Sequence, residues 1–518
     1  MKRNKFMRLG LIAVLFTGMT FTSCDDLLDI NYNPNFPTEG KMSTLLPSAG
    51  ATTAAQFGYN GTLIGTMWLQ HTTQGNSTNQ YNTLVNYQLL TSEYNGIWTN
   101  AYANTLPDLK EVIALAEKEK AWNYWIIAKV MTAYNFHMLT DLYEDIPFTE
   151  ALNPTLYPKP KYDNSKTVVY PGILKLLDEA IAKEADGLAA SNPVITKQDF
   201  YFGGKIAKWV SFAKSLKLKI MMRDFTTYKA QIEALLAAGG LLEEDCAMTA
   251  FEDATNKGNP FYEFNIRQLN TTENVRACHT LCEYLINYND PRIENIYEIK
   301  ASASATATTY AQKYEGLPCG KKPETSGPTG IPLTNSSKFM QRYNDPVYLM
   351  NKAESYFLIA EAYARLDNKA KAKENYENGV RASFNRWAAS TGKADAFLAG
   401  SYMFDQTSIE TMLKSILTQK WVSFARANAL DGALDRMRTG IPALDPTRTV
   451  RVADHDRSQG LTPGYVLGTL VTPASTVLQA NETPRRLLIP DASAQYNPNA
   501  PKTKAITEPM WWQVAKGI

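Results

Sequence analysis

Apolar residues recur at helical spacing along much of this 518-residue chain, and this periodicity limits its fold more than any other feature. From Trp122 they fall at positions 122, 125, 126, 130, 133, 134, 137 and 138, which lie on one side of a helix. A second run spans 349–364, breaks at 366–368 and resumes at 372–380. Because strand signals are sparse, we predict a mainly α fold with long loops and few short strands.

The two helices predicted over 347–385 differ in the size of their facing side chains. Small Ala residues let the helix axes approach, while Tyr and Phe fill the groove between them. A helix pair of this size is similar to a tetratricopeptide unit of about 34 residues. We therefore expect an α-α superhelix built from such pairs. The segments with this pattern are about 121–139, 205–223, 347–385 and 408–430.

Two of these segments carry further local signals. Thr407-Ser408-Ile409-Glu410 has the pattern of a capping box and predicts the start of a helix. Within 207–222, lysines cover much of the side opposite the apolar residues. We interpret them as a solvated helix face, not as a site for a polyanion. They are Lys208, Lys214, Lys217 and Lys219.

The first 24 residues have the three parts of an export signal. A basic head (1–8) precedes a short apolar run (9–16), and Thr22-Ser23-Cys24 resembles a bacterial lipobox, whose cysteine is acylated and becomes the new first residue. We predict a signal peptide over 1–23, a lipidated tether over 24–45 and a single body over 46–518. The alternatives are a signal peptide with an incidental cysteine and a genuine membrane anchor. No later stretch approaches 18 uncharged apolar residues.

Charge and cysteine usage narrow the function classes. Removing residues 1–23, which contain four basic residues and no acid, lowers the formal charge from +2 to −2. A chain so close to neutral lacks the excess positive charge that is typical of nucleic-acid-binding proteins.

The cysteines after Cys24 can form disulfides in three different ways, and the sequence selects none. For the i,i+4 pair Cys278 and Cys282, we prefer buried free thiols to a zinc site. The four are Cys246, Cys278, Cys282 and Cys319.

No catalytic motif is found in the sequence. It has four histidines and lacks H-E-x-x-H, G-x-S-x-G and G-x-G-x-x-G. His137 lies on the apolar stripe and is interpreted as a core imidazole. Asp454-His455-Asp456 is interpreted as a solvated loop, and 316–322 as a turn and not a phosphate loop. We therefore predict no catalytic residue, no metal site and no cofactor. The chain has 51 acidic residues, so a pair of carboxylates that hydrolyses glycosides stays an alternative, but no motif singles out two of them.

Several motifs in a fixed order resemble the SusD/RagB family of outer-membrane nutrient-binding lipoproteins, closest to its SusD-like branch. The resemblance spans nearly the whole chain. At Glu144 the family usually has Gly. The matching motifs are Cys24-Asp25-Asp26-Leu27-Leu28-Asp29-Ile30-Asn31, Leu142-Tyr143-Glu144-Asp145-Ile146-Pro147-Phe148, 209–218, 353–362, Arg438-Thr439-Gly440-Ile441-Pro442 and 484–490.

The resemblance implies a lipid-anchored protein on the surface of a Bacteroidetes-type bacterium. Such a protein caps a TonB-dependent (SusC-like) transporter and hands it an oligosaccharide or a peptide, without covalent chemistry. Three alternatives remain: a peptide-binding RagB-type receptor, a secreted glycoside hydrolase and a protein-interaction solenoid. A glycan ligand would need aromatic rings for its C–H faces and amides or acids for its hydroxyl edges.

The polar loop region from Trp68 to Tyr81, which includes the loop-prone stretch 70–81, offers one mixture of these groups. We predict ligand contacts from Trp68, His71, Asn79 and Tyr81. The competing interpretation is that Trp68 belongs to the core and the loop only faces solvent. Trp98 and Tyr102, four residues apart on a predicted helix, are assigned to packing.

Overall fold

The computed structural model describes residues 40–75, 78–320, 335–445, 465–473, 476–479 and 481–513. The predicted signal peptide, Cys24 and Asp454-His455-Asp456 therefore lie outside the described residues. The chain divides into two units, Met1–Lys41 and Met42–Ile518, and every helix and strand below belongs to the second.

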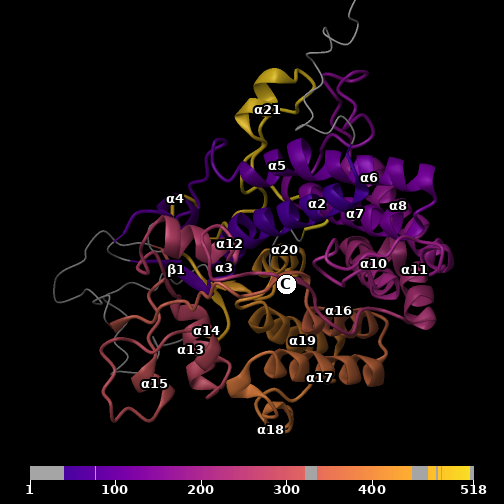
Figure 1. Ribbon diagram of the computed structural model, residues 1–518. Coiled ribbons are helices and arrows are strands. Elements are labelled where there is room, and N and C mark those ends of the chain that lie inside the picture. Colours follow the sequence, from indigo (N-terminus) through magenta and orange to yellow (C-terminus); the bar gives the residue numbers. More distant parts are fainter. Residues whose placement is uncertain are drawn as a thin grey trace, which may run out of the picture. The chain divides into compact units, whose positions relative to one another are not determined.

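Helices dominate the second unit, as the periodicity predicted (Figure 1). Its first half contains α2 (Met42–Gln56), α3 (Thr62–Trp68), α4 (Asn82–Val85), α5 (Gly96–Asn100), α6 (Leu106–Glu119), α7 (Trp122–Tyr143), α8 (Tyr170–Ala182), α9 (Glu184–Gly187), α10 (Ile206–Met221) and α11 (Phe225–Ala238). Its second half contains α12 (Pro260–Tyr262), α13 (His279–Asn287), α14 (Ile293–Ile296), α15 (Tyr310–Lys313), α16 (Lys352–Arg365), α17 (Lys369–Asn385), α18 (Ala394–Leu398), α19 (Ile409–Ser423), α20 (Ala429–Thr439) and α21 (Asp491–Tyr496).

Short helical turns of other kinds join or extend these helices. The π-helical turns are η2 (Phe57–Gly61), η3 (Ala101–Thr105), η4 (Ser165–Val169) and η6 (Glu263–Gln268), and the 3₁₀ turns are η5 (Met222–Asp224) and η8 (Ala388–Ser390). Helix α2 begins at Met42, within the range predicted for the tether.

Helix α7 is buried on nearly all of its sides, which makes it a central element of the core. It starts at Trp122, as the apolar spacing predicted, and runs four residues beyond the expected end at 139. His137 is fully buried on this helix, so its assignment to the core is confirmed. Burial lowers the pKa of His137 to about 4, even though Asp141 lies one turn away.

Helices α16 and α17 form the predicted pair, joined by the turn at 366–368. Asn351 caps α16 by accepting from the amide of Glu354, and Asn368 caps α17 in the same way. The axes approach closely at Gly379, where an added Cβ would lie 2.7 Å from the ring of Phe357. Figure 1 shows this pair beside α19. The capping box of α19 joins Ser408 to Thr411, one residue later than the sequence pattern indicated.

The strands are few and short, as expected. β1 (Thr72–Gln74) pairs antiparallel with β3 (Val275–Ala277), and β2 (Cys246–Met248) pairs antiparallel with β4 (Val347–Met350). β5 (Leu444–Asp445) and β6 (Leu470–Val471) form a parallel pair. The stretch 70–81 was expected to be a polar loop, but it contains β1, whose three residues are all buried. Cross-strand pairing satisfies the backbone hydrogen bonds of β1, so its polar residues can be buried.

Charged side chains cross the core between helices. The prediction of a solvated lysine face is wrong for Lys219, which is about 5% exposed and pairs with Glu354 (2.6 Å) and Asp431 (2.9 Å). Two buried carboxylates compensate its charge, and they raise its pKa although burial opposes this. The apolar spacing could not reveal this pairing because the partners come from α16 and α20.

Candidate functional site

A pocket of about 440 Å³ opens between three segments that are distant in the sequence: α5 with η3, the irregular segment 147–160, and α21. Figure 1 shows α21 beside α5. Five prolines line the pocket: Pro107 lies in the first turn of α6, and the other four keep the segment 147–160 out of a helix. The lining residues are Trp98, Tyr102, Pro107, Pro147, Glu150, Ala151, Leu152, Asn153, Pro154, Tyr157, Pro158, Pro160, Ser493, Tyr496 and Asn497.

Trp98 belongs to an aromatic cluster behind this pocket. Its ring lies 4.9 Å from that of Tyr102, 5.0 Å from that of Tyr143 and 6.1 Å from that of Tyr162, with which it is stacked. Tyr102 donates to the carbonyl of Pro147 (2.7 Å), which ties η3 to the proline-rich segment. Burial raises the pKa values of Tyr102, Tyr143 and Tyr162, so these phenols stay protonated at neutral pH.

Hydrogen bonds attach α21 and the chain after it to the opposite wall. The hydroxyls of Tyr162 and Ser493 lie 2.7 Å apart, and Asn497 donates to the carbonyl of Pro160 (2.7 Å). Asn499 donates to the carbonyl of Lys159 (2.8 Å). These contacts join the two walls of the pocket, which are more than 300 residues apart in the sequence.

Two tyrosines of the lining are open to solvent. Tyr157 is 42% exposed and Tyr496 is 78% exposed, so both rings are accessible to a ligand. Polar side chains from both walls lie among them: Glu150, Asn153 and Ser493. A pocket with aromatic faces and scattered hydrogen-bonding groups suits a molecule with both apolar faces and hydroxyl edges.

The lining is poorly suited to hydrolysis. Among the residues around this pocket, all of which are described, Glu150 is the only acid, and it accepts from the amide of Lys161 (2.9 Å). Glycoside hydrolysis usually requires two facing carboxylates. The described ranges contain no group of three or more His, Cys, Asp and Glu side chains that could hold a metal ion.

The four residues predicted to contact ligand do not form one surface. Trp68, His71 and Tyr81 are buried, with exposures of 5%, 0% and 2%, whereas Asn79 is exposed. The alternative that Trp68 belongs to the core is therefore the one the structure shows. The hydroxyl of Tyr81 donates to Asn265, and the ring of His71 lies 5.6 Å from that of Trp421. Ligand contact by these four residues stays a prediction, which the burial of Trp68, His71 and Tyr81 does not favour.

Sequence reasoning missed most of the pocket. Trp98 and Tyr102 do pack as predicted, but they also line the cavity. Tyr157 and Tyr496 were not singled out. The signal that could have found Tyr157 is its position inside the proline-rich run 147–160, whereas nothing local marks Tyr496.

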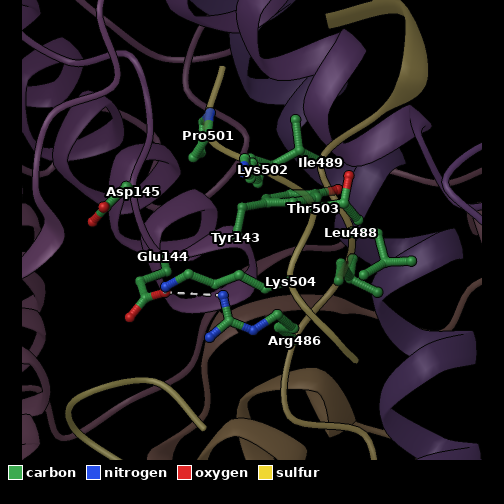
Figure 2. A pocket seen from close by; sticks show the side chains of 11 residues that line it. Tyr143, Glu144, Asp145, Arg486, Leu488, Ile489, Pro501, Lys502, Thr503 and Lys504 are labelled. Atoms are coloured by element: carbon green, nitrogen blue, oxygen red, sulfur yellow. Dashed lines mark hydrogen bonds and ion pairs between the residues drawn. The ribbon is translucent and has the colours of Figure 1, made fainter. Parts of the chain in front are cut away.

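A second, smaller pocket of about 30 Å³ lies at the end of α7 (Figure 2). Figure 2 shows Glu144, Arg486 and Lys504 pointing toward one another. The Glu144 carboxylate accepts from Arg486 Nη1 (2.9 Å) and Lys504 Nζ (2.6 Å). Burial opposes ionisation of Glu144, but these two cations hold its pKa below the ordinary value. The cavity has room for little more than a water molecule. We therefore interpret these ion pairs as contacts that hold the segment 486–504 against the end of α7.

Residues 34–457 match the profile of one protein family, SusD-like_2, described as "Starch-binding associating with outer membrane". The chain belongs to this SusD-like family. The resemblance stated from its motifs is thereby confirmed. No curated protein sequence matches the chain.

Solved structures of SusD homologues share the fold of this SusD-like protein. A homologue from Bacteroides uniformis ATCC 8492 superposes with a TM-score of 0.70 at 22% identity, covering 91% of this chain and 99% of the other. A chitin-binding homologue from Flavobacterium johnsoniae gives 0.67 at 20% identity, covering 92% and 97%. A homologue from Bacteroides thetaiotaomicron VPI-5482 gives 0.67 at 20% identity, covering 93% and 100%.

In the fold, motifs of the family that are distant in the sequence contact one another: 484–490 contacts 142–148, and 438–442 contacts 353–362. The segment 484–490 joins the end of α7 through the amide of Leu487, which donates to the carbonyl of Leu142 (2.8 Å). Arg438 binds Glu361 of α16 through two hydrogen bonds of 2.6 Å. The motifs are therefore packing signatures. Among the helices that the structure describes, none combines the length and apolarity needed to cross a membrane.

Proposed function

We propose that this SusD-like protein is a cell-surface lipoprotein, anchored through Cys24, that binds an oligosaccharide in the pocket between α5 and α21. It delivers this ligand to a partner TonB-dependent transporter and does not cleave it. The observation that carries the proposal is the pair of accessible rings, Tyr157 and Tyr496, in a proline-walled pocket with polar groups among them. A sugar ring stacks on such rings while its hydroxyls bond to amides and acids.

Two further observations support a glycan over other ligands. The family description names starch, and similar structures include proteins named for chitin binding. The pocket volume of about 440 Å³ accommodates one to two sugar units and leaves the rest of a chain outside. The scarcity of acids in the lining argues against the hydrolase alternative.

Isothermal titration with chito-oligosaccharides, malto-oligosaccharides and a peptide pool tests the ligand class. We expect at least one glycan series to bind, with Tyr157→Ala and Tyr496→Ala each weakening it about 2–10-fold, because each removes one stacking contact. Tyr157→Phe and Tyr496→Phe keep the ring and should bind within about 2-fold of the parent. Binding of peptides alone would favour the RagB-type receptor, and no binding of any kind would favour the solenoid.

Two companion measurements test the remaining parts of the proposal. Chromatography of each bound glycan after long incubation should return it uncut; release of shorter products would identify a hydrolase. Affinity purification from membranes should recover a β-barrel transporter with this protein, and recovery without it would remove the delivery step.

A further inference from the structure

Cys278 and Cys319 lie in two chain segments that pair with each other. Cys278 directly follows β3 and precedes the first turn of α13. The amide of Leu317 donates to the carbonyl of Ala277 (2.8 Å), and the amide of His279 donates to the carbonyl of Leu317 (2.7 Å). Leu317 and Cys278 thus form a parallel bridge. Cys319 is two residues beyond Leu317, in the bend that follows this bridge.

The two thiols contact each other in a small buried cluster of their own. Cys278 and Cys319 are 0% and 2% exposed and pack with Tyr465 and Val471. The neighbouring Cys278 and burial both raise the pKa of Cys319. Burial opposes ionisation of Cys278, but its hydrogen bonds with Cys319 and Thr280 hold its pKa below the ordinary thiol value.

The backbone around the pair is fixed from both sides. The amide of Cys278 donates to the carbonyl of His71 (3.2 Å), and the amide of Gly320 donates to the hydroxyl of Thr73 (3.3 Å). Both acceptors belong to the β1 region, so β1 holds the two cysteine segments together. A disulfide needs such neighbouring segments, because its Cα atoms must lie within about 7 Å.

We propose that Cys278 and Cys319 are oxidised to a disulfide as the exported chain folds, a step that rests on the export assigned to the protein above. The thiolate of one of the two cysteines attacks one sulfur of a disulfide-bonded donor, such as an oxidoreductase of the cell envelope, and releases one donor thiol. The thiolate of the other cysteine then attacks the sulfur of the first and releases the second donor thiol. Two electrons pass to the donor, and the two thiol protons end on its sulfurs.

The bond would close a loop of 40 residues, 279–318, that contains α13, α14 and α15. Cross-linking a loop of this length restricts the unfolded chain and so stabilises the folded one. Formation during folding explains why burial of both thiols is no obstacle, since the donor needs access only before the cluster closes.

Peptide mapping of the full protein, isolated from membranes with free thiols alkylated at lysis, tests the pairing. Trypsin cleaves after Arg276, Arg292, Lys313 and Lys321, so the proposal predicts a linked pair of peptides, 277–292 with 314–321. Fragmentation should place the link on Cys278 and not on Cys282. A link through Cys282 would overturn the proposal, and so would alkylated Cys278 and Cys319 together with a melting midpoint that does not respond to dithiothreitol after refolding in a redox buffer.

A second arm does not depend on export. The purified protein is reduced, unfolded and refolded in a glutathione redox buffer, and the melting midpoint is compared with that of the reduced form. We expect the oxidised form to melt several degrees higher, about 3–6 °C, and dithiothreitol to abolish the difference. Cys278→Ala and Cys319→Ala should each lose this sensitivity.

Matched controls come from the other two buried cysteines. Cys246→Ala and Cys282→Ala should keep the same sensitivity to dithiothreitol as the parent. A parent protein whose melting midpoint ignores dithiothreitol would contradict the disulfide even if export is confirmed. If the link forms in the redox buffer but not in cells, export to an oxidising compartment is what has failed.

Discussion

Glu144 ends α7 with a backbone conformation that suits glycine, the residue the family usually has there. Its φ of 71° and ψ of −103° lie in a region of backbone conformation that residues with a side chain rarely adopt. The chain tolerates this because Glu144 binds Arg486 and Lys504, whose segment closes over the end of α7. A strained residue is thus held in place by the two cations it recruits.

Two variants at Glu144 that lose the same ion pairs should differ in stability. Glu144→Gly relieves the backbone strain and Glu144→Ala does not, so the Gly variant should have a free energy of unfolding about 1 kcal/mol higher. Denaturant unfolding of both proteins measures the difference. An Ala variant as stable as the Gly variant would show that the conformation carries no strain.

Protonation of His137 should make the free energy of unfolding depend on pH. Its imidazole faces Asp141 on its own helix, Arg223, Lys219 and Asp431 from other elements, and the ring of Tyr170. Burial lowers its folded pKa to about 4, below the value of about 6.5 in the unfolded chain. The unfolded state therefore binds a proton first as pH falls, and stability is lost between about pH 6.5 and 4.

The corresponding measurement is the free energy of unfolding across that pH window. One such group contributes a slope of up to about 1.4 kcal/mol per pH unit. The His137→Gln variant should show a shallower slope than the parent between pH 6.5 and 4. His71, whose pKa burial lowers to about 3, supplies a second contribution of the same sign that remains in the variant.

Between elements, α16 and α20 are joined by the Arg438–Glu361 pair. Both Nη atoms of Arg438 donate to Glu361, which is fully buried and also accepts from Arg365 on its own helix. Burial opposes ionisation of Glu361, yet the two arginines lower its pKa to about 2. We predict that Glu361→Gln costs up to about 3 kcal/mol, because the buried Arg438 guanidinium then keeps only one of its two counter-charges, Asp435.

An exposed pair on α17 provides the control for that substitution. Lys371 and Glu374 lie 2.8 Å apart on the helix surface, and Glu374→Gln should leave the denaturation midpoint unchanged. Equal effects of the two substitutions would show that the buried pair does not join the helices.

The elements themselves were largely predictable, and their contacts were not. Apolar spacing located α7, α10, α16, α17 and α19 because each buries a continuous stripe. Lys219 was misjudged because its partners lie on α16 and α20, which the spacing within α10 cannot reveal. The pocket was missed for the same reason: Tyr157 and Tyr496 are 339 positions apart in the sequence, and only the fold brings them to one cavity.

At the scale of the whole molecule, the proposal includes a lipid anchor at Cys24, which lies outside the described residues. We predict that mass spectrometry finds Cys24 as the first residue, carrying a lipid through its sulfur. The Cys24→Ala variant should leave the membrane fraction, because a single apolar run of this length does not anchor a protein stably. An unmodified thiol at Cys24 in membrane-bound protein would contradict the anchor.

The central claim is that the pocket between α5 and α21 is where this SusD-like protein holds its ligand. The most direct test is a crystal structure with an oligosaccharide that binds in titration. We predict a sugar ring stacked against Tyr157 or Tyr496, with Trp98 behind the site. A glycan bound instead beside Trp68, His71, Asn79 and Tyr81, with the pocket empty, would contradict the account.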